Sequence, residues 1–99
     1  MRTYVLDPEA QANIQSQTDY LVAQGAYAAA EALVARLETY LADFLCHYPA
    51  TGNHIKERDL WEIWIPRTRL VLWYRFTDIE LQVVRIWHSA QNRSAFDPY

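Results

Sequence analysis

Apolar side chains recur every three or four residues between positions 26 and 48, which is the longest regular pattern in the chain. They are Tyr27, Ala30, Leu33, Val34, Leu37, Tyr40, Leu41, Phe44 and Leu45. This spacing places them on one face of an amphipathic helix, so the pattern predicts a helix from Ala26 to Tyr48. Pro49 ends it, because a proline disfavours helical backbone in the residue before it.

A second helix is predicted ahead of this one, from Pro8 to Gln24. Asp7 is a typical N-cap residue, and Glu9 suits the positive end of the helix dipole. Gly25 ends the helix, and so short a link predicts that the two helices form an antiparallel hairpin.

Alternation replaces the helical period in the second half of the chain. Three runs rich in tryptophan and β-branched residues, "LWEIWI", "RLVLWYRF" and "LQVVRIWH", predict three antiparallel strands at residues 60–65, 69–76 and 81–88. "RTYVL" at residues 2–6 predicts a further strand at an edge. We therefore expect an α+β protein with a two-layer β-α-α-β-β-β fold, in which the helical hairpin covers one face of an antiparallel meander.

The alternation also divides each strand between two faces. The face beneath the helices is expected to carry Leu70, Leu72, Tyr74, Phe76, Val84 and Ile86. The opposite face is expected to carry Arg69, Val71, Trp73, Arg75, Val83, Arg85 and Trp87, together with either Trp61 or Trp64.

Length and charge narrow the possible functions. The 99 residues suffice for a single domain over residues 1–99 with one two-layer core. A net charge of −3 opposes a general role in nucleic-acid binding, since proteins that neutralise many phosphates carry a basic excess. Cys46 is the only cysteine, so no disulfide can form within the chain, and no Cys/His spacing indicates a metal site. We expect no cofactor, no membrane span and a cytoplasmic location.

The face that interleaves arginine and tryptophan has two interpretations. Such a face can bind RNA, because rings stack on bases while guanidinium groups hold phosphates. It can also be a solvated face or the seat of a protein partner. We favour the partner or structural interpretation, because the chain is acidic. The binding candidates on this basis are Trp64, Arg69, Trp73, Arg75, Arg85, Trp87 and Arg93.

His88 follows Trp87 at the predicted end of the last strand. Histidine is the side chain most often used as a general base, but a histidine at a strand end is more often a structural hydrogen-bonding residue. Ser89 has no G-x-S-x-G context, so a hydrolase triad is not supported.

The order of these segments resembles the RelE/ParE family of bacterial toxins from type II toxin–antitoxin modules. The resemblance covers nearly the whole chain, including "HYPATG" after the second helix. The stretch "RIWHSAQNR" near the C-terminus is the most specific part, and the residues that match the family ending are Tyr74, Arg75, Asp78, Arg85, His88 and Arg93.

The resemblance implies a toxin that is neutralised by a cognate antitoxin in a hetero-oligomer. It also implies one of two activities. ParE-like members poison DNA gyrase, and RelE-like members are ribosome-dependent mRNA interferases that use basic side chains on the sheet. If this chain were a nuclease, the catalytic candidates would be Arg69, Arg85, His88, Arg93 and Tyr99.

The chain departs from the nuclease pattern at two strands. Glu62, Trp64 and Ile65 stand where the nuclease branch places cations, and Val71 stands where it has an arginine, although Arg69 lies two residues earlier on the same face. RNA cleavage needs charge stabilisation and acid–base help. The sequence therefore favours a ParE-like toxin that binds DNA gyrase. An mRNA interferase, or a degenerate member that only binds its antitoxin, remains the alternative.

Overall fold

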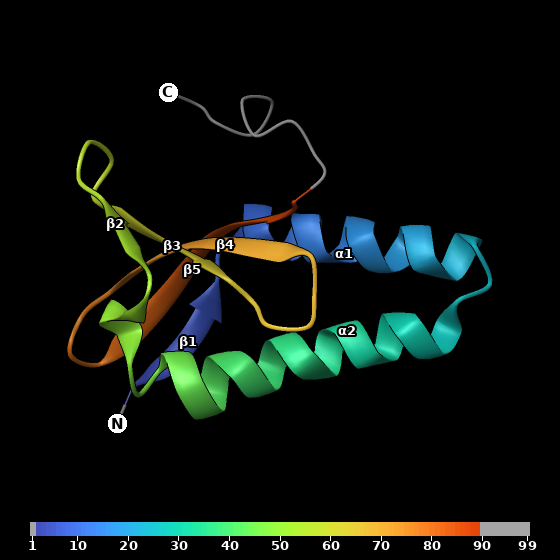
Figure 1. Ribbon diagram of the computed structural model, residues 1–99, viewed down its shortest axis with the longest axis horizontal. Coiled ribbons are helices and arrows are strands. Elements are labelled where there is room, and N and C mark those ends of the chain that lie inside the picture. Colours follow the sequence, from blue (N-terminus) through green and yellow to red (C-terminus); the bar gives the residue numbers. More distant parts are fainter. Residues whose placement is uncertain (1, 90–99) are drawn as a thin grey trace.

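A five-stranded mixed sheet and a helical hairpin make up residues 2–89, the part of the chain that the computed structural model describes (Figure 1). The elements in chain order are β1 (Thr3–Leu6), α1 (Pro8–Ala23), α2 (Tyr27–Thr39), η1 (Tyr40–Leu45), η2 (Pro49–Thr51), β2 (Asn53–Ile55), β3 (Leu60–Trp64), β4 (Leu70–Phe76) and β5 (Glu80–His88). The strand order is β1-β5-β4-β3-β2. β1 lies at an edge and runs parallel to β5, whereas the other pairs are antiparallel. The expected α+β architecture is confirmed, with β2 as an additional strand.

The two helices lie side by side, and in Figure 1 the turn that joins them projects well beyond the sheet. Gly25 in this turn has a φ of 76°, a left-handed value that glycine adopts without steric cost. Asp7 occupies the N-cap position of α1, but its carboxylate makes no capping bond and instead accepts a hydrogen bond of 2.8 Å from Gln82. The predicted second helix is regular only to Thr39 and continues as the π-helix η1 to Leu45.

Two apolar clusters lie on opposite faces of the sheet. The main cluster, between the sheet and the hairpin, includes Leu37, Leu41, Leu45, Ile63, Leu70, Leu72, Tyr74, Leu81, Val83 and Ile86. The second cluster consists of Leu60, Val71, Trp73 and Trp87, with Ile55 and Val84 packed against it. The expected placement of Leu70, Leu72 and Tyr74 beneath the helices is confirmed.

A β-bulge in β5 changes the predicted faces of two valines. Tyr74 lies opposite Val83, whereas Trp73 lies opposite Arg85, so Val84 is an extra residue on its strand. Val83 therefore joins the main cluster and Val84 packs against the second one, the reverse of the expectation. Strict alternation across the whole of the last strand was the wrong assumption.

The register of β3 decides which tryptophan shares the face with Trp73. Trp61 lies opposite Tyr74 and packs against the main cluster, while Trp64 lies opposite Val71 on the other face. Trp64 is the candidate that belongs to the far face, which we define as the sheet face away from the hairpin.

A side chain of α1 takes the place of β1 as a hydrogen-bond partner along the part of β5 that β1 does not reach. β1 pairs with β5 only as far as Val83. Beyond that point the Asn13 side chain of α1 accepts a hydrogen bond of 3.0 Å from the backbone N–H of Ile86. A buried strand edge needs such partners, because unsatisfied backbone groups are costly.

Candidate functional site

The two indoles at the centre of the far face are buried, although a cleft lined by Leu60, Val84 and Arg85 lies beside Trp73. Trp73 and Trp87 are only 1% and 4% exposed and meet edge to face with ring centroids 4.8 Å apart. The Trp73 indole N–H donates a 2.8 Å hydrogen bond to the Glu62 carboxylate, and the Arg58 guanidinium lies 5.5 Å from the Trp73 ring centre. These two indoles are therefore part of the core, and the expected surface of stacked rings and arginines is not present there.

Trp64 differs from the other predicted aromatic candidates. Its side chain is 61% exposed at the end of β3, although its neighbour across the strand, Val71, is buried. An indole that remains this exposed is available to a partner.

The three arginine candidates of the far face are separated. Arg85 forms an ion pair with Glu9 in the first turn of α1. Arg69 and Arg75 are both exposed, but one precedes β4 and the other lies near its end. Six strand residues span about 20 Å, so these guanidinium groups do not converge on one point.

His88 lies on the opposite side of the sheet from these arginines. It pairs with Leu70 at the end of β5 and shares its face with Ile86, while Arg85 and Trp87 point the other way. The backbone of the next residue, Ser89, donates a 2.7 Å hydrogen bond to the Arg69 carbonyl. The structure thus brings the backbone of this strand end to Arg69 but does not place the imidazole on the face of the arginines. Arg93 and Tyr99 lie outside the described residues.

The "PATG" segment after the second helix holds the Tyr74 side chain in place with two hydrogen bonds. The Tyr74 hydroxyl donates a 2.6 Å hydrogen bond to the Pro49 carbonyl and accepts one of 3.3 Å from the Gly52 N–H. Burial raises the pKa of Tyr74 to about 12, although the hydrogen bond from Gly52 acts in the other direction. This part of the family resemblance therefore has a packing role.

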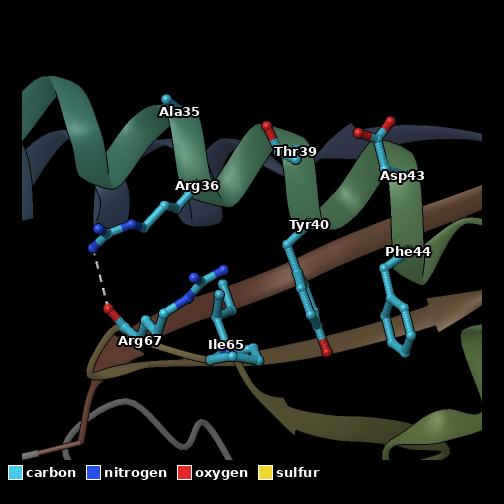
Figure 2. Close-up of a pocket in the computed structure, with 9 residues that line it drawn as sticks. Ala35, Arg36, Thr39, Tyr40, Asp43, Phe44, Ile65 and Arg67 are labelled. Carbon is cyan, nitrogen blue, oxygen red and sulfur yellow. Dashed lines mark hydrogen bonds between the residues drawn. The ribbon is translucent and has the colours of Figure 1, made fainter.

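A cleft of about 350 Å³ lies between the second helix and the β3–β4 turn. Figure 2 shows Arg36, Tyr40 and Phe44 pointing from successive helical turns toward Ile65 and Arg67, while Asp43 points away from them. Arg36 donates a 3.3 Å hydrogen bond to the Arg67 carbonyl across the cleft. Sequence reasoning did not identify this site, because its two walls are far apart in the chain. The spacing of Arg36, Tyr40 and Phe44 was the available signal.

Other chemical candidates are few within residues 2–89. No cluster of three metal-ligating side chains occurs among them. Cys46 is buried, and burial raises the pKa of its thiol, which disfavours the reactive thiolate. Neither helix in this described range is long and apolar enough to cross a membrane.

Comparisons with known proteins agree with this architecture. A chain described as "Chromosomal ParDE TA system from P. aeruginosa" superposes with a TM-score of 0.72 at 17% sequence identity, covering 89% of this chain and 96% of that one. No curated protein sequence matches. The sequence profile described as "ParE toxin of type II toxin-antitoxin system, parDE" matches residues 4–93. Because this match spans most of the sequence, the chain belongs to the ParE toxin family of type II toxin–antitoxin systems.

Proposed function

We propose that this ParE-family toxin inhibits growth by binding DNA gyrase in the cytoplasm, and that a ParD-like antitoxin holds it in an inactive hetero-oligomer. We name gyrase as the target because the sequence resembles the ParE branch, whose members poison this enzyme. We name a ParD-like antitoxin because the family description and the structurally similar system both pair ParE with ParD.

One observation carries the choice of protein binding over RNA cleavage. Glu62 stands at the centre of the far face, where the nuclease branch has cations, and its carboxylate holds the Trp73 indole. The Arg58 guanidinium lies over the same indole, and a carboxylate beside it reduces the positive potential that would stabilise a phosphate or a phosphorane-like transition state.

The placement of the candidate groups supports the same choice. A nuclease site needs an acid–base group and several cations converging on one phosphate. Here His88 is on one face of the sheet, Arg69 and Arg75 are at opposite ends of the other face, and Arg85 is paired with Glu9. Exposed Trp64 gives the far face an anchor of the kind that protein interfaces use.

A direct test uses the purified toxin in two reactions. In the first, DNA gyrase, ATP and relaxed plasmid are incubated with increasing toxin, and supercoiled and linear products are separated on a gel. In the second, ribosomes programmed with a defined mRNA are incubated with the same toxin, and the RNA ends are mapped. We expect loss of supercoiling or accumulation of cleaved plasmid in the first reaction and intact mRNA in the second. Cleaved mRNA with unaffected gyrase would establish the interferase alternative, and no effect in either would favour a member that only binds its antitoxin.

A further inference from the structure

We infer that the cleft between the second helix and the β3–β4 turn binds a segment of the antitoxin that combines an acidic side chain with a large apolar one. This inference rests on the proposed function, because it takes the antitoxin as the partner. It adds where a segment of the partner docks and which chemistry that segment carries.

The apolar part of the cleft is built from aromatic rings on the helix and from the sheet below. Tyr40 and Phe44 lie with ring centroids 5.2 Å apart, and both are only half-buried. Ile65 beneath them is 2% exposed. Half-buried rings above a buried Ile65 favour the binding of another apolar side chain, because its entry removes more apolar surface from water.

The charged part of the cleft lies at one end, where the side chains of Arg36 and Arg67 approach from opposite walls. Arg36 reaches across to the carbonyl of Arg67, and the Arg67 guanidinium points back toward the helix between Arg36 and Tyr40 in Figure 2. No carboxylate within residues 2–89 forms an ion pair with either group, and Asp43, the acidic residue on the cleft rim, is directed away. Two neighbouring cations of this kind attract an anion, and an arginine fork matches a carboxylate geometrically.

The backbone at Arg67 holds this arrangement at a conformational cost. Its φ is 61°, in the left-handed region where the Cβ of a residue other than glycine is sterically disfavoured. The turn is fixed by Thr68, whose hydroxyl donates a 2.9 Å hydrogen bond to the Ile65 carbonyl and accepts a 3.0 Å hydrogen bond from the Leu70 N–H. Glycine would suit the backbone better, so an arginine at this position indicates a use for its side chain.

The charges around the cleft favour a protein segment over a nucleic acid. The exposed surface of the same helix carries Glu31, Glu38 and Asp43. A continuous phosphate backbone would be repelled by them, whereas a polypeptide can place one carboxylate at the arginines and an apolar side chain beside them. Along the helix Arg36 lies roughly 6 Å from Tyr40 and roughly 12 Å from Phe44, which suits an acidic and an apolar side chain one to two helical turns apart.

The test uses the full-length toxin, separated from the antitoxin encoded beside its gene and refolded. Intact antitoxin and overlapping 20-residue peptides that cover its sequence are titrated against wild-type toxin and three variants. Arg36→Ala and Arg67→Gly remove the two guanidinium groups. Lys56→Ala is the charge-matched control, at the opposite end of β3. Arg67→Gly also relieves the left-handed backbone, so its stability should equal or exceed that of the wild type.

We expect one peptide to bind wild type and Lys56→Ala equally, and to lose about tenfold or more in affinity for each arginine variant. Replacing its acidic residue by the matching amide should weaken binding to wild type by a similar factor and have a smaller effect in Arg67→Gly, where only Arg36 remains to meet the carboxylate.

Three results would overturn the inference. If intact antitoxin binds all variants with unchanged affinity, it docks elsewhere and only this inference fails. If intact antitoxin does not bind wild-type toxin at all, the proposed antitoxin pairing fails with it. If a labelled single-stranded RNA or a second toxin copy, followed by sedimentation, shows the arginine dependence instead of the peptides, the cleft serves that ligand.

Discussion

Of the two glycines in the chain, Gly52 has the less room for a side chain. A Cβ at this position would lie 2.6 Å from the Glu62 carbonyl oxygen and 2.7 Å from the Tyr74 hydroxyl. Gly25 is the matched contrast, because it has a φ of 76° but a Cβ added there would meet no atom within 4 Å. The first glycine is required by close packing and the second by backbone conformation.

We predict that Gly52→Ala lowers the free energy of unfolding by about 2–3 kcal/mol, because backbone atoms must move to admit the methyl group. Gly25→Ala should cost only about 1 kcal/mol, the strain of a left-handed alanine. Urea unfolding followed by tryptophan fluorescence measures both. Equal urea midpoints for Gly52→Ala and wild type would show that the segment from Pro49 to Gly52 is not packed tightly against Tyr74.

The raised pKa of Tyr74 predicts a loss of stability in alkali. The unfolded side chain ionises near 10.0 and the folded one near 12. The folded state therefore holds the proton more tightly, and its contribution is complete below pH 10 and is lost as the pH rises toward 12. The size of this contribution is at most about 3 kcal/mol. Unfolding free energies measured between pH 8 and 11.5 should fall more steeply for wild type than for Tyr74→Phe, and parallel curves would contradict this.

His88 is predicted to order the end of β5 and not to transfer a proton. His88→Gln keeps a hydrogen-bonding side chain but cannot titrate near neutrality. Growth inhibition by this variant should remain within about threefold of wild type, since the imidazole lies on the face away from the arginines. Loss of toxicity in a folded, antitoxin-binding His88→Gln protein, together with mRNA cleavage by wild type alone, would support the interferase.

At the scale of the elements, β4 divides the two apolar clusters. Leu72 is fully buried beneath the hairpin, whereas Arg69 is exposed just before the strand begins. Substitutions on the two sides of this strand should therefore have very different effects.

Leu72→Asp is predicted to unfold the protein, because an unpaired carboxylate in this core costs several kcal/mol. Arg69→Ala should change the free energy of unfolding by less than about 0.5 kcal/mol. Circular dichroism with thermal melting distinguishes the two variants. Equal melting temperatures would mean that the faces of the sheet had been assigned the wrong way round.

The elements that the sequence predicts correctly are those with a local cause. The helical period from Tyr27 onward and the alternation in β4 arise within single segments, so the hairpin and the central strands could be recognised. β2 was missed because three residues, two of them polar, show no period. The bulge at Val84 was missed because it depends on pairing with Trp73 and Tyr74 of another strand. The cleft between Arg36 and Arg67 was missed for the same reason, since only the tertiary fold brings its walls together.

At the scale of the whole molecule, several large apolar side chains remain on the surface. Within residues 2–89 the most exposed are Ile79 at 76%, Tyr20 and Tyr27 at 64%, and Tyr48 and Trp64 at 61%. Tyr20 and Tyr27 lie near the turn of the hairpin, whereas Trp64 lies on the sheet. Scattered rings of this kind are also normal on monomers, so it is membership of a family whose toxins pair with an antitoxin that makes a covered surface the expectation here.

Free toxin is therefore predicted to self-associate at micromolar concentration and to become monodisperse when its antitoxin is added. Sedimentation velocity with and without antitoxin measures this, and Trp64→Ser should reduce the self-association of free toxin. A free toxin that is monomeric over the whole concentration range, and unaffected by the antitoxin, would contradict the prediction.

The parallel pairing of β1 with β5 affects how the protein is made. The first strand has no neighbour in the sheet until the last strand has been synthesised, because β5 is the only strand that pairs with it in the described chain. At about 5–20 residues per second, several seconds separate the synthesis of the two. The nascent chain cannot complete its sheet during that interval. A toxin with this topology completes its sheet only after β5 has been synthesised, and this delay leaves time for an antitoxin to meet it as it folds.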